Sequence, residues 1–209
     1  MDKNAEIGMN NITRKGEDYI SRLSNAFNAD IYDKIELLSS SLEKAWVEGR
    51  NIYICGNGGS AANAMHIAND LIYGVGSCGN SKVQKGMKVE ALSSNSAVLT
   101  CLANDTGYEN IFSKQLKTKA VGKDILIALS GSGNSKNILK AIKTAQEIDM
   151  KEFSIVAFKG GTCKSISHNC LHFEVNDMQI AEDTQLIVGH MIMQYLSERR
   201  DAIYLGEVT

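Results

Sequence analysis

The fold is decided by residues 51–60, Asn51-Ile52-Tyr53-Ile54-Cys55-Gly56-Asn57-Gly58-Gly59-Ser60, where an apolar run ends in a glycine-rich loop. The apolar run is typical of a buried strand, and a helical pattern follows it from Ser60 to about Tyr73. A second such unit begins at residues 124–129, which precede the loop Ser130-Gly131-Ser132-Gly133-Asn134-Ser135 and another helical pattern. Two strand–loop–helix units in one chain predict an α/β fold with parallel strands.

The rest of the chain completes a single domain. We expect a five-stranded parallel sheet flanked by helices on both faces, which makes a three-layer sandwich. Because parallel sheets bind ligands at the carboxyl ends of their strands, both glycine loops are expected at one ligand site. Strands are expected at 51–55, 87–92, 124–129, 153–158 and 171–175, helices near 60–73, 95–103, 108–118, 134–148 and 179–198, and a surface loop at 74–81.

A helical extension precedes the sheet. Apolar residues recur at steps of three and four between about Asp18 and Gly49, which predicts a helix or a helix pair with one apolar stripe. Such a stripe packs either on the chain's own core or on a neighbouring subunit, and the sequence does not distinguish between these two possibilities. The expected divisions are a helical segment over 1–50, the sheet domain over 51–200 and a tail over 201–209.

Composition excludes several classes of protein. The chain has 209 residues, of which 44% are hydrophobic, enough for one full core. Its net charge is −2, and no run of Lys or Arg indicates a surface for nucleic acid or anionic membrane. No apolar run has the length of a signal peptide or a membrane span, so a cytoplasmic protein is expected. The five cysteines form no Cys-x-x-Cys pair, which favours reduced thiols.

The two loops favour a phosphorylated ligand. Glycines let backbone N–H groups converge, the following helix N-terminus adds partial positive charge, and serine hydroxyls supply uncharged donors. A nucleotide is not expected, because Ser60 and Asn134 stand where a Walker loop needs lysine and no complete Gly-x-Gly-x-x-Gly is present. The alternative is that both loops are ordinary strand-to-helix turns.

Two helices carry candidate chemical groups. His66 and Asp70 are four residues apart on the helix after the first loop and therefore share one face. Glu182 and His190 lie on the last predicted helix. A histidine and a carboxylate beside a sugar phosphate can move a proton between adjacent carbons, and the same four side chains suit zinc. The alternative for His66 and Asp70 is a surface ion pair.

Spacing constrains any metal site. Glu182 and His190 are eight residues apart, which is about 12 Å along one helix. Either both side chains reach toward one ion, or they come from different subunits. The second possibility would make a homo-oligomer part of the site.

A family resemblance rests on several of these segments together. The chain resembles the phosphoheptose isomerases (sedoheptulose-7-phosphate isomerases) of the sugar-isomerase (SIS) domain superfamily over nearly its whole length. The segments that carry the resemblance are Cys55-Gly56-Asn57-Gly58-Gly59-Ser60, Met65-His66, Ala103-Asn104-Asp105-Thr106-Gly107-Tyr108, Ser130-Gly131-Ser132-Gly133-Asn134-Ser135 and the stretch from Glu182 to His190.

The resemblance implies a reaction and a set of site residues. The implied reaction converts sedoheptulose 7-phosphate to D-glycero-D-manno-heptose 7-phosphate for bacterial heptose biosynthesis. Asp70 would be the base that moves the proton between C1 and C2, with His190 as its acid–base partner. It also implies one zinc ion per site and a homotetramer with interfacial active sites. Substrate would contact Asn57, Gly58, Gly59, Ser60, Asn104, Asp105, Ser130, Gly131, Ser132, Ser135 and Glu182, with the three serines at the phosphate, and zinc would be held by His66, Asp70, Glu182 and His190.

Three positions depart from the family pattern. Asp70 stands where family members usually have glutamate, Glu182 where they commonly have glutamine, and an arginine often found shortly after the carboxylate is absent from Ile72-Tyr73-Gly74. These departures leave open an isomerase of a different sugar phosphate. A second alternative is a non-catalytic SIS scaffold of the replication-initiator-associating type.

Overall fold

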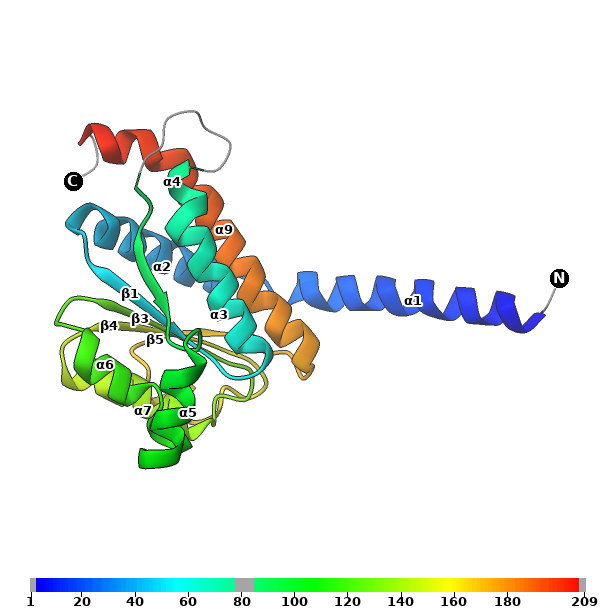
Figure 1. Cartoon of the computed structure of the whole chain (residues 1–209). Coiled ribbons are helices and arrows are strands. Elements are labelled where there is room, and N and C mark those ends of the chain that lie inside the picture. Colours follow the sequence, from blue (N-terminus) through cyan, green and yellow to red (C-terminus); the bar gives the residue numbers. More distant parts are fainter. Residues whose placement is uncertain (1–2, 78–84, 207–209) are drawn as a thin grey trace.

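The structure, a computed structural model, describes residues 3–77 and 85–206. Helices and strands alternate along most of the chain (Figure 1). In chain order they are α1 (Lys3–Asn25), α2 (Ala29–Glu48), β1 (Asn51–Cys55), α3 (Gly59–Asn69), a π-helical turn η1 (Asp70–Gly74), α4 (Val75–Ser77), β2 (Lys88–Ala91), α5 (Ser96–Thr106), a 3₁₀ turn η2 (Tyr108–Asn110), α6 (Ser113–Lys119), β3 (Ile125–Ser130), α7 (Lys136–Glu147), β4 (Lys151–Val156), α8 (Gly161–Ile166), β5 (Asn169–His172) and α9 (Met178–Leu205).

The described residues form one five-stranded sheet in the order β2-β1-β3-β4-β5. Every neighbouring pair is parallel, and in the centre Ile52 of β1 lies opposite Val89 of β2 and Ile125 of β3. The predicted α/β class and parallel five-stranded sheet are therefore confirmed. Each strand starts within two residues of its predicted start.

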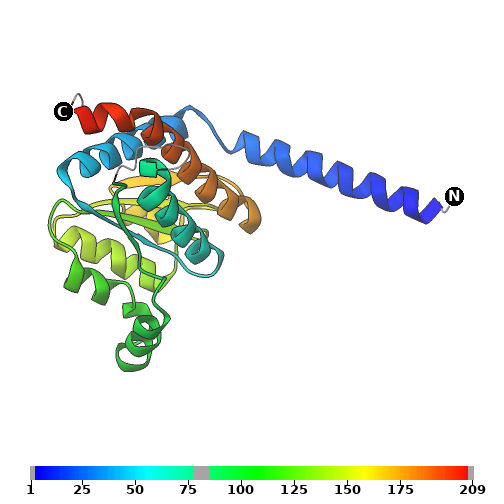
Figure 2. The same cartoon turned by 45° about the horizontal axis from the view of Figure 1, so that its top comes forward.

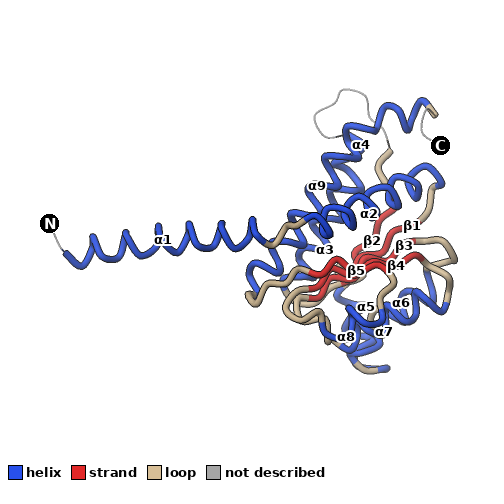
Figure 3. The backbone as a smooth tube through the Cα atoms, turned by 180° about the vertical axis from the view of Figure 1, so that it is seen from behind, coloured by secondary structure: helices blue, strands red, loops and turns tan. Residues whose placement is uncertain are grey.

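Helices cover both faces of the sheet (Figure 3). Side chains alternate across a strand: on β1, Ile52 and Ile54 belong to the core under α2, α3 and α9, whereas Tyr53 and Cys55 belong to the core under α6, α7 and α8. The two cores and the sheet between them are the predicted three-layer sandwich. The four described cysteines are free, and burial raises the pKa of the Cys55 thiol.

The N-terminal extension is a pair of helices. Asn28 starts α2 by accepting a hydrogen bond from the backbone N–H of Ile31 (3.0 Å), and Gly49, with φ 65°, ends it. The predicted apolar stripe is divided: Ile35 and Leu38 of α2 are buried in the sheet domain, whereas Ile20 of α1 is 63% exposed.

Helix α1 projects away from the rest of the molecule (Figures 1 and 2). Its last turns are held by α9, because the Tyr19 hydroxyl donates to Asp183 (2.5 Å) and the Arg22 guanidinium pairs with Asp177 (2.7 Å). Burial and the hydrogen bond to Asp183 raise the pKa of Tyr19 to about 12. The remainder of the helix therefore extends into solvent in a single chain.

Several helix predictions were wrong in detail. The helix expected at 60–73 changes to π geometry at Asp70, and the helix expected at 108–118 is divided into η2 and α6. Residues 75–77 of the expected loop are helical, and residues 78–81 lie outside the described residues. Helix α8 was not predicted, because this six-residue helix in the crossover between β4 and β5 is too short for a helical repeat.

No helix among the residues that the structure describes is long and apolar enough to cross a membrane.

Candidate active site

The two glycine loops meet at the point where the strand order reverses. β1 and β3 are neighbours, while the strand that follows β1 in the chain lies on its other side, and open α/β sheets bind ligands at the carboxyl ends of two such strands. Two hydrogen bonds between Asn57 and Asn137 (2.9 and 2.8 Å) join the first loop to the first turn of α7, which follows the second loop, and the Tyr108 hydroxyl donates to Asn57 (2.8 Å). Asn137 was not predicted, because a single asparagine carries no local motif and its burial on α7, at 2% exposed, is evident only from the structure.

The first loop is shaped by close backbone contacts. Gly58 has φ 54°, and a Cβ on Gly56 would lie 2.4 Å from the carbonyl oxygen of Ser60. A Cβ on Gly59 would lie 2.3 Å from Oε2 of Glu182, so that carboxylate lies against the N-terminus of α3. A carboxylate there is stabilised by the helix dipole. The N-terminus of α3 therefore already faces a carboxylate of the chain itself.

The second loop is preorganised around its serines. Ser130 Oγ accepts from the Gly133 N–H (3.2 Å), and Ser132 Oγ accepts from the Asn134 N–H (3.3 Å). Ser135 is the N-cap of α7, and its side chain makes no capping hydrogen bond. Gly133 has φ 68°, and a Cβ there would lie 2.0 Å from the Gly160 carbonyl oxygen. The loop therefore presents hydroxyls at a helix N-terminus in a fixed conformation.

His66, Asp70 and His190 form one group. Oδ2 of Asp70 lies 3.5 Å from Nε2 of His66 and 3.7 Å from Nε2 of His190, and the two imidazole nitrogens are 3.1 Å apart. The side chains of His66 and His190 are 50% and 47% exposed, whereas that of Asp70 is 19% exposed. The structure thus brings together three residues that are up to 124 positions apart in the chain.

Close packing of two helices positions this group. Helices α3 and α9 lie side by side (Figures 1 and 3), and a Cβ on Gly189 would lie 2.6 Å from Cγ1 of Ile67. Because Gly189 precedes His190 and Ile67 follows His66, this close contact between the helices lies beside the two imidazoles. The π-helical turn begins at Asp70, and such turns are common at functional sites.

The donors of the group fit a zinc ion. Ligands placed tetrahedrally at zinc–nitrogen and zinc–oxygen distances lie about 3.3 Å from one another, close to the 3.1, 3.5 and 3.7 Å sides of this triangle. All three ligand atoms lie within 4.8 Å of one another. Two imidazoles and one carboxylate are a common zinc set, with a fourth position open.

Glu182, Asn104 and Asp105 lie outside this group. The Glu182 carboxylate is at Gly59, about 12 Å along α9 from His190. Asn104 donates to Asp105 (2.8 Å) at the end of α5, and both are exposed. A hydrogen bond to Asp105 raises the pKa of the Cys101 thiol on the same helix. The roles assigned to these three residues stay predictions.

Comparisons with known proteins identify the family. The model of the SIS domain family matches residues 17–158. The phosphoheptose isomerase of Helicobacter pylori (strain ATCC 700392 / 26695) is 36% identical over 159 residues, which are 76% of this chain and 78% of the relative.

Solved structures give the same fold. Phosphoheptose isomerases of Neisseria gonorrhoeae and Francisella tularensis superpose with TM-scores of 0.81 and 0.83, at 23% and 22% identity. Each comparison covers 91% of this chain and 98% of the solved one. The group at His66 and the serine loop thus lie within a shared architecture, and the chain belongs to the phosphoheptose isomerases of the SIS domain family.

Proposed function

We propose that this chain is an aldose–ketose isomerase that converts sedoheptulose 7-phosphate to D-glycero-D-manno-heptose 7-phosphate. The observation that carries the proposal is the group formed by His66, Asp70 and His190 on the helix pair beside the switch point. The family supports the reaction, since a relative 36% identical to the chain is a phosphoheptose isomerase.

The serine loop is the proposed phosphate site. Ser130, Ser132 and Ser135 surround the N-terminus of α7, where hydroxyls and backbone dipoles favour an anion. The first loop, with Asn57 fixed by its bonds to Asn137, is proposed to contact the sugar chain. In this arrangement the phosphate fixes one end of the substrate, and the carbonyl end is left for the histidines.

The reaction then needs two proton carriers, one at each of two adjacent carbons of the substrate. Asp70 removes a proton from C1 of the ketose while His190 protonates the oxygen on C2, which gives an enediol. Returning the proton to C2 and removing the proton from the oxygen on C1 yields the aldose. The Asp70 carboxylate and the His190 imidazole are 3.7 Å apart, so both can contact neighbouring atoms of one substrate.

Zinc is the proposed cofactor, held by His66, Asp70 and His190. Within one chain the Glu182 carboxylate lies at Gly59 instead, so as the proposed fourth ligand it would have to come from a neighbouring subunit. When bound, zinc would polarise the substrate oxygens and so acidify the neighbouring C–H bond. Because Oδ2 of Asp70 lies within 3.7 Å of both imidazoles, Asp70 is assigned to the metal and to the proton transfer together.

A homotetramer with active sites at subunit interfaces is part of the proposal. In one chain, the side chains of His66 and His190 are about half exposed, so the site is open on one side. Helix α1 projects from the body with Ile12 68% and Ile20 63% exposed. A neighbouring subunit packed on α1 would cover both the open side of the site and the exposed isoleucines of α1. A cytoplasmic location is proposed with it, because the substrate is a phosphorylated metabolite.

The test is an assay of the purified chain with sedoheptulose 7-phosphate in deuterated water. We expect aldose to form with deuterium at C2, and turnover to fall when a chelator removes the metal. Asp70→Asn and His190→Ala are each expected to lower kcat by at least a hundredfold, because each removes a proton carrier.

The matched control is Asp201→Asn, at an exposed carboxylate near the end of α9. It should leave turnover unchanged. Failure of the metal-loaded chain to exchange deuterium or form aldose would contradict the proposed substrate, and full activity in Asp70→Asn would remove Asp70 from the mechanism.

A further inference from the structure

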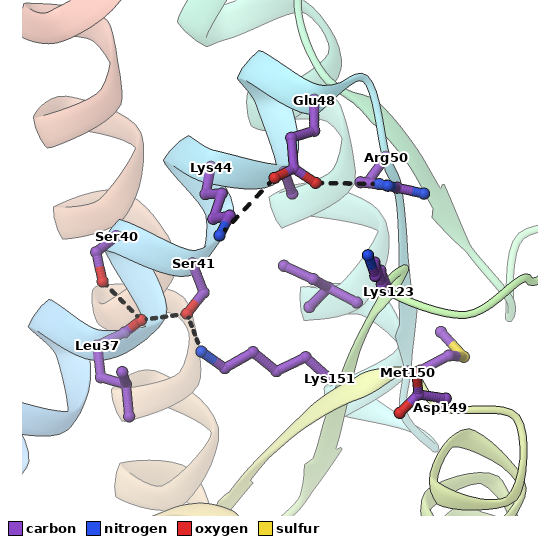
Figure 4. A pocket seen from close by; sticks show the side chains of 12 residues that line it. Leu37, Ser40, Ser41, Lys44, Glu48, Arg50, Lys123, Asp149, Met150 and Lys151 are labelled. Carbon is purple, nitrogen blue, oxygen red and sulfur yellow. Dashed lines mark hydrogen bonds and ion pairs between the residues drawn. The ribbon is translucent and has the colours of Figure 1, made fainter. Parts of the chain in front are cut away.

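A cavity lies at the amino ends of the strands, at the opposite end of the sheet from the serine loop. Figure 4 shows the residues that line it. It has a volume of about 580 Å³, within the range of small-molecule sites. It opens between α2 and the amino ends of β1, β3 and β4. Since the serine loop follows the carboxyl end of β3, the two places are separated by the length of a strand, about 20 Å.

Four cations converge on this cavity. Arg50 immediately precedes β1, Lys123 lies two residues before β3, and Lys151 is the first residue of β4. These three strands are adjacent and parallel, so their amino ends lie within about 10 Å of one another. Lys44 adds a fourth cation from α2.

The charges are only partly neutralised. Glu48 lies 3.2 Å from Arg50 and 3.8 Å from Lys44. The Lys151 ammonium donates to the uncharged Ser41 hydroxyl (2.7 Å). Within the described residues the Lys123 ammonium has no hydrogen bond or ion pair. Even with Asp149 on the rim, four cations face two carboxylates.

The backbone at Lys123 is an independent observation. Its φ is 72°, and its N–H donates to the carbonyl oxygen of Asp149, whose own φ is 60°. A left-handed backbone costs a residue with a Cβ about 1 kcal/mol or more, whereas glycine adopts it freely. A lysine at this position keeps a cation at the cavity despite that cost, and such outliers cluster at ligand sites.

We infer that this cavity binds a small anion that carries a diphosphate or phosphate group. The cations supply the charge, and the apolar wall formed by Leu37, Ala45, Ile125 and Met150 supplies contact area for an organic portion. The inference does not depend on the proposed isomerase activity, because the cavity lies at the amino ends of the strands and the proposed phosphate site at their carboxyl ends.

The test is calorimetric titration of the full chain with pyrophosphate at low ionic strength. We expect the double variant Lys123→Gly and Lys151→Met to bind at least tenfold more weakly than the unmodified chain. Glycine suits the left-handed backbone at position 123, so this variant should keep its melting temperature. Affinity should also fall as salt is raised, because the contacts are exposed.

A control variant completes the design. Lys143→Met removes an exposed lysine of α7 outside the cavity. It should bind pyrophosphate as the unmodified chain does. The inference is overturned if the unmodified chain gives no binding or if the double variant binds equally well. Tighter binding of adenosine diphosphate than of pyrophosphate would indicate a nucleotide, and equal binding a phosphate group alone.

Discussion

At the scale of single residues, Gly189 decides how closely the two histidine-bearing helices approach. Gly189→Ala would place a Cβ 2.6 Å from Ile67 Cγ1 and separate α3 from α9 beside His66 and His190. We expect at least tenfold weaker zinc binding and a loss of about 1–3 kcal/mol in the free energy of unfolding. Competition with a chelating dye and denaturant titration measure the two effects.

Gly16→Ala is the matched control, because nothing lies within 4 Å of a Cβ at that position of α1. It should leave zinc affinity unchanged and slightly stabilise the helix. Equal zinc affinity in the Gly189 and Gly16 variants would mean that this contact does not position the metal ligands.

Ser132 tests the phosphate assignment. Ser132→Ala is expected to raise KM about tenfold or more with little change in kcat, because the phosphate is bound equally in the ground and transition states. Steady-state kinetics separate the two constants. Ser165→Ala, at an exposed hydroxyl on α8, should change neither. A fall in kcat alone would contradict the assignment.

Site residues with a characteristic residue type and spacing could be predicted from the sequence. Residues that matter because they are small, or because they hydrogen-bond to a distant residue, could not. His66 and Asp70 share a helix face, so their proximity could be predicted from a spacing of four residues alone. Gly189 and Asn137 act through long-range packing and hydrogen bonds, which no local pattern records. The position of Glu182 depends on how α3 and α9 align, so its distance from His190 was foreseen but not its partner at Gly59.

At the scale of elements, Asp177 caps α9, and the stability that this cap contributes depends on pH. It accepts from the backbone N–H groups of Gln179 (3.0 Å) and Ile180 (3.2 Å) at the start of α9. Its pKa is held below its ordinary value by the hydrogen bond from Arg22 and by those backbone donors. A carboxyl with a lowered pKa in the folded state stabilises above its unfolded pKa, and this contribution is lost as pH falls through the folded value.

We therefore expect Asp177→Ala to lower the free energy of unfolding by about 1 kcal/mol at pH 7, with a smaller difference from the unmodified chain below about pH 4. Urea denaturation at pH 7 and pH 3 provides the measurement. Asp30→Ala, on the exposed face of α2, is the comparison. A constant difference at both pH values would show that the charge of Asp177 does not contribute.

The periodicity of the sequence predicted the strands better than it predicted some of the helices. The strands are buried apolar runs, and their number, direction and approximate bounds could be predicted. Helix α8 could not, because its residues Gly161–Ile166 contain too few turns to show a repeat. The change to π geometry at Asp70 was also missed, since the apolar spacing of residues 60–73 fits an ordinary helix.

At the scale of the whole molecule, the projecting α1 predicts self-association. The double variant Ile12→Asp and Ile20→Asp should sediment at a lower mass than the unmodified chain, which we expect to be a tetramer, because it places charge on an apolar helix face. Val121→Asp, at an exposed position of the sheet domain, should not change the mass. Sedimentation equilibrium distinguishes these outcomes, and a monomeric unmodified chain would contradict the expectation.

The π-helical turn at Asp70–Gly74 has a further consequence for how this site tolerates change in chain length. A π turn accommodates an extra residue within one helical segment, and each residue of an α-helix rotates the following side chains by about 100°. Deleting a single codon between positions 71 and 74 would let the segment relax to α geometry. The side chains after it would then keep their orientation relative to α9, because the deletion removes the residue that the π turn absorbs, and His66, which lies upstream, would keep its place.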